Sequence, residues 1–219
     1  MLFRLRKDVK GFFRGRTRVI VWDQHKLLYV RMPKSGNVSI RRAIDGHIER
    51  RMSKSRIIQL DDDWTRFSFV RNPWSRLLSL YKQKVGTEAT STRMIDGVYQ
   101  GFVNHAIPIH SEMSFEEFCD VVCDIPDHRT DKHLQSQAYT LIKNGQPIVG
   151  FIGKLERMNE DWKLLMEKVG LDYELPHFNR TQKKNEHYSS DYTSEALVQK
   201  VADRYREDIE HFGYEFERR

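Results

Sequence analysis

The stretch Arg31-Met32-Pro33-Lys34-Ser35-Gly36-Asn37-Val38-Ser39 decides the fold of this 219-residue chain. An apolar run at 27–30 precedes it and a helix-like run at 40–44 follows it, which indicates a strand, a tight turn and a helix. The glycine lets the backbone bend and approach a ligand closely, and the amide groups of a helix start attract anions. The lysine adds a positive charge and the serines add hydroxyl donors. We therefore expect a loop that binds phosphate.

The order of residues in this loop differs from that of the Walker A loop of nucleoside triphosphatases. That motif ends in Gly-Lys-Ser/Thr after a longer glycine-rich loop. In this chain Lys34 comes before Gly36, so the pattern is not met. A small-molecule or nucleotide kinase stays an alternative, but this order and the lack of a dedicated carboxylate cluster for magnesium count against it.

A second stretch, 67–81, again has the order strand, turn and helix. Asn72 is a suitable N-cap, and Pro73 takes the first helical position. Arg71 closes the strand, and Ser79 lies about two turns into the helix that folds back beside it. An arginine and a hydroxyl brought together in this way suit a terminal phosphate monoester. Two phosphate sites on successive strand–helix units predict one ligand with phosphates at both ends.

This pair of motifs resembles the sulfotransferases that use 3′-phosphoadenosine 5′-phosphosulfate (PAPS). In that family a Pro-Lys-x-Gly-x-x-Ser loop binds the 5′-phosphosulfate, and an Arg-(x)7-Ser pair binds the 3′-phosphate. The resemblance gives the first role to 33–39 and the second to Arg71 with Ser79. It implies that the donor is held by Lys34, Ser35, Gly36, Asn37, Val38, Ser39, Arg71 and Ser79. It also implies that no metal takes part.

The closer resemblance is to the Golgi-type carbohydrate sulfotransferases, in particular the chondroitin 4-O-sulfotransferase-like branch and its bacterial relatives. The run Val70-Arg71-Asn72-Pro73-Trp74-Ser75-Arg76-Leu77 is similar to their Val-Arg-Asp-Pro-Phe-x-Arg-Leu. Later segments at 115–118, 150–156 and 175–180 follow the family's order. The resemblance runs from about Leu27 to Gly213. It implies an α/β fold with a P-loop-like central parallel sheet flanked by helices, and a glycan or polysaccharide acceptor.

The resemblance also implies a mechanism. An acceptor hydroxyl attacks the sulfur of PAPS in line with the leaving phosphate, and Lys34 with the loop amides stabilises the growing negative charge. Ser39 binds the 5′-phosphate. The segment Asn179-Arg180-Thr181 resembles a late family segment that closes over the nucleotide, which places Arg180 at the 3′-phosphate.

The general base is the least defined residue. Histidine is the usual choice for moving a proton near neutral pH. Some relatives carry a histidine just after the second strand, where this chain has only 59–63, Gln-Leu-Asp-Asp-Asp. His133 matches a family histidine in a later segment on the substrate side and is the predicted base. Asp62 and Glu156 are the alternatives, and a surface or packing role for His133 stays open.

The remaining pattern predicts a single α/β domain over 1–219. We expect a hairpin of 18–22 with 26–30, and further strands at 55–60, 66–70 and 146–152. Expected helices cover 37–51, 73–85, 114–124, 131–144, 158–169 and 193–212. Ser114 and Glu117 form a capping box, and Gly145, Gly170 and Gly213 fall where helices end. Residues 86–112 lack clear periodicity and read as a long connection.

Composition limits the partners. The net charge of +6 and the pI near 9.3 favour anionic ligands, including anionic glycans, and no nucleic-acid motif accompanies the charge. No apolar run reaches transmembrane length. Because the Golgi relatives carry a membrane anchor, the resemblance implies a cytoplasmic, bacterial-type form or a trimmed domain. Apolar residues share one face of the basic segment 1–17, the pattern of a helix that lies on an anionic membrane, although packing on the domain itself is the alternative. A non-catalytic glycan- or membrane-binding module with this fold also stays open.

Overall fold

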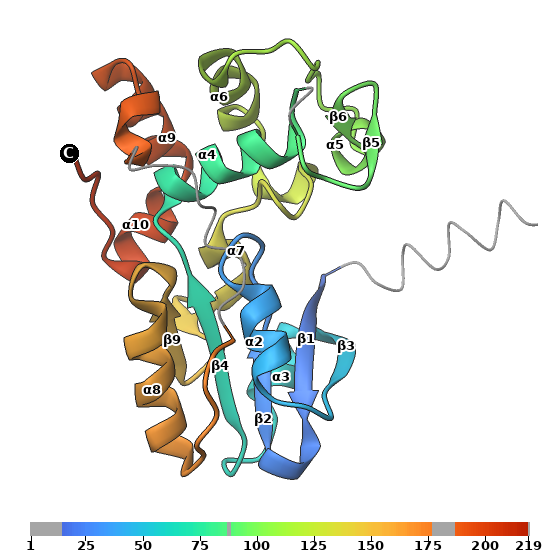
Figure 1. Cartoon of the computed structure of the whole chain (residues 1–219), viewed down its shortest axis with the longest axis vertical. Coiled ribbons are helices and arrows are strands. Elements are labelled where there is room, and N and C mark those ends of the chain that lie inside the picture. Colours follow the sequence, from blue (N-terminus) through green and yellow to red (C-terminus); the bar gives the residue numbers. More distant parts are fainter. Residues whose placement is uncertain (1–14, 87–88, 177–186, 219) are drawn as a thin grey trace, which may run out of the picture.

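The computed structural model describes residues 15–86, 89–176 and 187–218. Most of the segment 1–17 and all of 177–186, including Arg180, lie outside these residues. The described chain forms an α/β layer with a mainly helical part above it (Figure 1). None of the described helices is long and apolar enough to cross a membrane.

The central sheet has the strand order β3-β1-β2-β4-β9. Its strands are β1 (Arg16–Trp22), β2 (Leu27–Val30), β3 (Ile48–Ser53), β4 (Thr65–Val70) and β9 (Phe151–Lys154). Strand β1 is antiparallel to β2 and β3, whereas β2 pairs with β4, and β4 with β9, in parallel. Only β1 therefore runs against the other strands of this sheet, and the expected α/β fold with a mostly parallel central sheet is confirmed.

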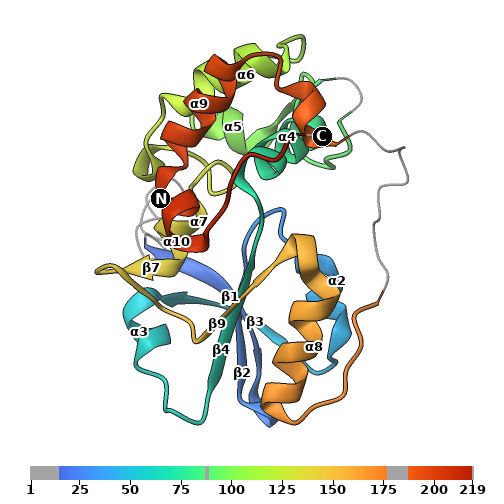
Figure 2. The same ribbon diagram turned by 90° about the vertical axis from the view of Figure 1, so that its left-hand side faces the viewer.

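Helices cover both faces of this sheet (Figure 2). On one face, α2 (Asn37–Ala43) and α8 (Met158–Val169) pack on a core that includes Ile20, Tyr29, Phe67 and Trp162. On the other face lie α3 (Lys54–Ile58), α7 (Gln137–Leu141) and α10 (Arg206–Phe212). Strand β2 and the last four residues of β1 and of β4 are buried on both sides, which is why these segments are largely apolar, whereas the edge strand β3 is mostly exposed.

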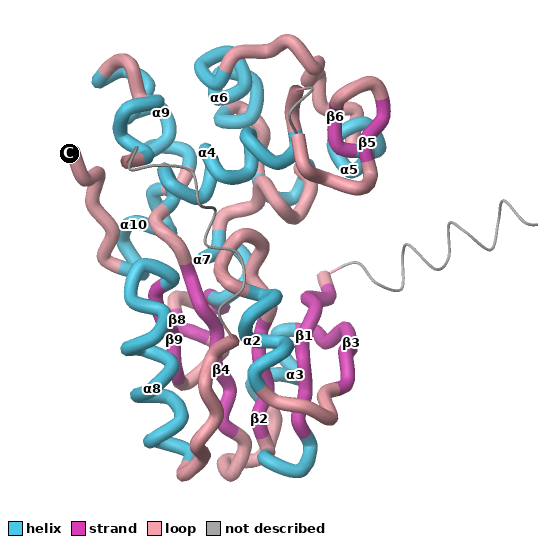
Figure 3. Tube along the Cα trace, viewed as in Figure 1, coloured by secondary structure: helices cyan, strands magenta, loops and turns pink. Residues whose placement is uncertain are grey.

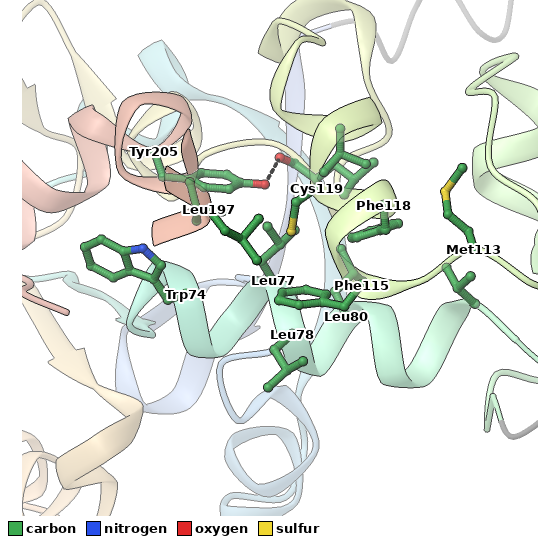
Figure 4. Close-up of a cluster of buried hydrophobic side chains, with 14 of the residues drawn as sticks. Trp74, Leu77, Leu78, Leu80, Met113, Phe115, Phe118, Cys119, Leu197 and Tyr205 are labelled. Carbon is green, nitrogen blue, oxygen red and sulfur yellow. Dashed lines mark hydrogen bonds between the residues drawn. The ribbon is translucent and has the colours of Figure 1, made fainter. Parts of the chain in front are cut away.

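The helical part is built around α4 (Pro73–Lys84), which continues directly from the carboxyl end of β4. Its apolar side packs against α6 (Phe115–Cys123) and α9 (Glu195–Arg204), with Leu77 and Phe118 among the buried residues (Figure 4). The Tyr205 hydroxyl donates to the Leu134 carbonyl at 3.0 Å. This packing fixes α4 above the edge of the sheet.

Several sequence predictions are confirmed. The β1–β2 hairpin, strand β4 and helices α4, α6 and α8 lie where the patterns placed them. The capping box of Ser114 and Glu117 is present, and Gly170 and Gly213 end helices in the left-handed conformation. The expected connection at 86–112 contains α5 (Gln100–Asn104) and the small hairpin of β5 (Met94–Ile95) with β6 (Val98–Tyr99) (Figure 3).

Other predictions are wrong. The helix expected over 37–51 ends at Ala43, and its second half forms the edge strand β3, whose backbone pairs with β1. The strand expected over 55–60 is helix α3, because Ser53 caps it by accepting from the Arg56 amide and Ile57 packs into the core. For β3, pairing with β1, which no local pattern reveals, overrides the helical propensity.

The remaining differences concern shorter elements. The helix expected over 131–144 shortens to α7, which starts after its cap Ser136. The strand expected over 146–152 is two pieces, β9 and β8 (Gln146–Pro147), and β8 forms a hairpin with β7 (Ile142–Lys143). Gly145, at φ +75°, therefore lies in a hairpin turn instead of at a helix end. The helix expected over 193–212 is broken at Tyr205 into α9 and α10.

Candidate active site

The loop after β2, residues 31–36, turns sharply before helix α2, and we call it the phosphate loop after its predicted role. Lys34 and Gly36 both have positive φ, at 70° and 78°. The Asn37 amide holds the turn, because its nitrogen donates to the Met32 carbonyl at 2.7 Å and its oxygen accepts from the Tyr29 hydroxyl at 2.7 Å. The Asn37 side chain therefore shapes the loop.

Lys34 lies among other cations. Burial, followed by the charges of Arg71, Lys84 and Arg76, lowers the pKa of the Lys34 amine to about 8. The amine donates to Gln83 Oε1, on α4, at 3.1 Å. A concentration of positive charge that is partly withdrawn from water favours an anionic ligand.

Arg71 follows strand β4 and contacts the first turn of α4. Its Nε and Nη2 donate to Ser75 Oγ at 3.0 and 2.8 Å. Burial is the main cause that lowers the pKa of Arg71 to about 10. Ser75, Ser79 and Gln83 are spaced by four residues and share one face of α4. Arg71 contacts this polar face at Ser75 and Lys34 contacts it at Gln83, with half-buried Ser79 between them.

Gln137, at the start of α7, joins the two motifs. Its side-chain oxygen accepts from the Arg71 amide at 2.9 Å and from Ser35 Oγ at 3.4 Å. Its side-chain nitrogen donates to the Arg71 carbonyl at 2.8 Å and to Asp208 at 3.2 Å. Gln137, Ser35 and Asp208 are all fully buried. The loop and the β4–α4 junction are therefore held in one fixed arrangement.

Arg76 ties a third segment to the same place. Its buried guanidinium donates to the carbonyl of Pro33 at 3.3 Å, of His133 at 3.0 Å and of Gln135 at 2.9 Å. The backbone around His133 is thereby held next to the phosphate loop, although the two are about a hundred positions apart in sequence.

His133 is held by Asp131. The Asp131 carboxylate accepts from the ring Nδ1 at 2.5 Å and from the His133 amide at 2.9 Å. This contact places the proton of the neutral ring on Nδ1 and leaves Nε2 as the acceptor. The ring packs edge-on against Tyr99, with centroids 5.1 Å apart. Burial lowers the pKa of His133, Lys84 and Lys132 lower it further, and Asp131 opposes them.

Lys84 acts on both candidate catalytic residues through its charge. It is 7% exposed, and its amine lies 3.5 Å from the centroid of the Tyr99 ring and donates to Ser91 at 3.2 Å. Its charge lowers the pKa of both Lys34 and His133. No sequence pattern marked Lys84, apart from its position at the end of the predicted helix.

The two alternative bases have different surroundings from those of His133. Glu156 accepts from the Asn72 amide at 2.7 Å and from the Tyr214 hydroxyl at 3.1 Å, so its carboxylate holds the β4–α4 junction. Asp62 belongs to the turn before β4, where Asp63 pairs with Lys26. That turn is at the amino edge of the parallel strands, because it directly precedes Thr65 of β4, which pairs with Leu27 at the start of β2. The phosphate loop follows the opposite, carboxyl end of β2.

The other expected residues are placed as follows. Ser39 is half-buried in the first turn of α2, and Val38 is exposed. Arg180 lies outside the described residues. Within the residues that the structure describes, no group of three or more His, Cys, Asp or Glu side chains could hold a metal ion. That no metal takes part in the reaction stays a prediction.

Sequence reasoning missed Ser75, Gln83, Asp131 and Gln137. Ser75 and Gln83 could have been found, because each lies four residues from Ser79, which the sequence analysis had identified, and so shares its face of α4. Asp131 has a weaker signal, its place two residues before His133. Gln137 has no local signal, because its partners are 66, 71 and 102 residues away in sequence.

Comparisons with known proteins identify the family of the chain. The model of the sulfotransferase family matches residues 17–215. The chain is 28% identical over 195 residues to carbohydrate sulfotransferase 12 of Xenopus laevis, covering 77% of this chain and 43% of that protein. It is 23% identical over 227 residues to carbohydrate sulfotransferase 14 of Danio rerio, covering 90% of this chain and 62% of that protein.

The chain thus spans about half the length of the curated relatives that it matches. No solved structure gives a significant match. The family model covers most of the chain, from the first strand to the end of α10 and beyond. The protein therefore belongs to the sulfotransferase family.

Proposed function

We propose that this protein transfers the sulfuryl group of PAPS to a hydroxyl of a carbohydrate. The observation that carries the proposal is that both phosphate motifs meet at Gln137, which accepts from Ser35 and from the Arg71 amide. One ligand with a phosphate at each end would contact both motifs. The names of the two curated relatives support a carbohydrate as the acceptor.

The side chains present fit such a donor. The charged neighbours that shift the pKa of Lys34 are all cations, so a bound polyanion would relieve repulsion among them. Lys34, Ser35 and Ser39, with the backbone of 36–38, would hold the 5′ end. The 3′-phosphate would be held by Arg71 with Ser75 and Ser79. Arg180, which lies outside the described residues, would also bind it.

PAPS, when bound, supplies the sulfuryl group that is transferred. Lys34 would donate hydrogen bonds where negative charge grows on the leaving phosphate, which is the largest stabilising effect in transfers of this type. His133 would accept the proton of the acceptor hydroxyl at Nε2, while Asp131 holds the ring through Nδ1. Arg71 would bind the nucleotide, whereas Lys34 and His133 would act on the reacting groups.

Calorimetry with two ligands tests the proposal. Adenosine 3′,5′-bisphosphate should bind to the full-length protein, and ATP with magnesium should bind at least about tenfold more weakly, because the Arg71 site is built for one terminal phosphate. Tighter binding of ATP with magnesium would favour a kinase. Binding of neither ligand would favour a non-catalytic module.

A further inference from the structure

Asp208, in the first turn of α10, is a buried acid that the proposed transfer does not use. Its side chain is fully buried, and α10 lies beside α7 (Figure 2). One carboxylate oxygen accepts from the Ala138 amide at 2.7 Å, and the other accepts from the side-chain nitrogen of Gln137 at 3.2 Å. Both of these partners are hydrogen-bond donors at the start of α7.

The surroundings of Asp208 suit a charged carboxylate. Burial raises the pKa of Asp208, and the charge of Arg76 together with the donors of α7 opposes this rise. A carboxylate offers an acceptor on each of its oxygens, whereas an amide of the same shape offers one acceptor and one donor group. Two donors therefore call for an acid at this position.

Asp208 controls which end of the Gln137 amide faces the two phosphate motifs. Its carboxylate attracts the amide nitrogen and repels the amide oxygen, so the oxygen is turned toward the Ser35 hydroxyl and the Arg71 amide. The nitrogen also donates to the Arg71 carbonyl at 2.8 Å. Because the two ends of an amide are nearly alike in shape, the donors and acceptors around it determine its orientation.

Each phosphate motif also has local support that does not involve Gln137. Asn37 holds the turn of the phosphate loop by its bonds to the Met32 carbonyl and the Tyr29 hydroxyl. Asn72 caps α4 at the other motif. Gln137 therefore acts on the position of one motif relative to the other more than on the shape of either.

We propose that Asp208 is a positioning residue for the sulfuryl donor, which fixes the phosphate loop relative to the β4–α4 junction through Gln137. The inference rests on the proposed function, because it takes one ligand to contact both motifs. A ligand with two ends gains affinity from its second end only when the geometry lets both ends bind at once. Loss of the Asp208 carboxylate should therefore weaken a nucleotide with two phosphates more than a nucleotide with one.

Asp208→Asn tests this role, because it keeps the shape of the side chain and removes one acceptor. The NH2 group of the new amide has to face either the Ala138 amide or Gln137, and both are donors. In the first case the start of α7 is displaced. In the second case the Gln137 amide flips and turns its own NH2 group toward the Ser35 hydroxyl and the Arg71 amide, which are donors as well.

Calorimetry on the full-length protein compares adenosine 3′,5′-bisphosphate with adenosine 3′-phosphate and adenosine 5′-phosphate. We expect Asp208→Asn to bind the bisphosphate about tenfold more weakly, and each monophosphate within about twofold of the unaltered protein. The bond from Arg76 to the Pro33 carbonyl at 3.3 Å also joins α4 to the phosphate loop and stays in the variant, so the loss should be partial.

Asp161→Asn is the matched control. Asp161 is also buried, accepts from the Lys154 amide at 2.7 Å and pairs with Arg157 at 3.1 Å. A purely structural loss, as we expect in this control, lowers the thermal unfolding midpoint and leaves the ratio of bisphosphate to monophosphate affinity unchanged. A change of that ratio in Asp208→Asn alone therefore reports on positioning and not on stability.

A rescue variant tests the contact between the two side chains. Gln137→Glu places a second carboxylate against Asp208, which should turn the side chain at position 137 and weaken bisphosphate binding. Adding Asp208→Asn to Gln137→Glu puts a donor opposite an acceptor again. We expect this double variant to regain part of the bisphosphate affinity that Gln137→Glu loses.

Three results would overturn the inference: an unchanged affinity ratio in Asp208→Asn, an equal change in Asp161→Asn, or a double variant that binds the bisphosphate no better than Gln137→Glu. If Asp208→Asn does not fold, the comparison of Gln137→Glu with the double variant decides. If the unaltered protein itself binds the bisphosphate no more tightly than the monophosphates, the proposed donor site is wrong, and not only the role of Asp208.

Discussion

Lys34 is placed by its loop among cations, and this placement makes its charge sensitive to pH. Its backbone adopts a positive φ, so the side chain is held over α4, where it reaches Gln83. The amine gains an anionic ligand as its partner only in the complex. A residue in this position should contribute more to transfer than to folding.

Lys34→Ala should therefore abolish transfer while the protein stays folded. Loss of charge stabilisation in the transition state should cost roughly 3–4 kcal/mol, a hundredfold or more in rate. The rate of sulfuryl transfer and the thermal unfolding midpoint should be measured together. A rate like that of the unaltered protein would show that the loop does not serve catalysis.

The pH dependence of nucleotide binding gives a second test of Lys34. Because its pKa is lowered to about 8, the amine is charged below that pH and neutral above it, so binding of adenosine 3′,5′-bisphosphate should weaken as the pH rises through about 8. Lys34→Arg should remove this dependence, since a guanidinium stays charged. Calorimetry from pH 6.5 to 9.5 measures both proteins, and an unchanged profile in Lys34→Arg would assign the titration elsewhere.

His133 should act on the acceptor and not on the nucleotide. His133→Ala should lower kcat by about a hundredfold or more and leave binding of adenosine 3′,5′-bisphosphate unchanged.

Lys84→Gln should raise the pKa of His133, because it removes a charge that opposes protonation, whereas Asp131 and Lys132 stay in place. The imidazole titration followed by NMR measures this shift.

The matched control is Lys82→Gln on the same helix, where the amine is exposed and pairs with Asp191. It should leave the pKa of His133 unchanged. A downward shift in Lys84→Gln, or equal shifts in both variants, would contradict the placement of Lys84 beside the histidine.

At the scale of elements, α7 locks the phosphate loop to the β4–α4 junction through one side chain. Gln137→Ala would remove the partner of the Ser35 hydroxyl and of the Arg71 backbone amide and carbonyl, while Asp208 would keep the Ala138 amide at 2.7 Å. The cost should be about 2–3 kcal/mol of unfolding free energy, because an unsatisfied buried polar group is expensive. Denaturant unfolding measures it, with the exposed hairpin variant Gln146→Ala as the control. Equal stability of the two variants would show that the Gln137 hydrogen bonds do not stabilise the fold.

The elements that the sequence predicts correctly are those with local signals. Gly36 marks a turn, Asn72 caps α4, and Ser114 with Glu117 caps α6. The elements that it misses depend on distant contacts. Residues 48–53 become a strand because β1 offers its free edge, and Gln137 becomes the centre of the site because partners far apart in sequence converge on it.

At the scale of the whole molecule, the site lies where the parallel strands β2 and β4 end and helix α4 begins (Figure 1). Ligands bind at this edge of α/β sheets because the loops after neighbouring strands converge there. The position of the site was predictable from the order of strand, loop and helix. His133 was identified only through the family resemblance and Asp131 was not identified at all, since both come from a segment between α6 and α7 that no local pattern ties to the loop.

The central claim is that the loop at Lys34 and the junction at Arg71 bind the two ends of one nucleotide. Calorimetry with adenosine 3′,5′-bisphosphate and adenosine 5′-phosphate tests it most directly, on the unaltered protein and on Arg71→Ala, Ser75→Ala and Ser79→Ala. The unaltered protein should prefer the bisphosphate, and Arg71→Ala should remove that preference, about 1.5–3 kcal/mol, with little effect on the monophosphate. The serine variants should show smaller losses in the same direction. Equal losses for both ligands in Arg71→Ala, or no preference in the unaltered protein, would contradict the claim.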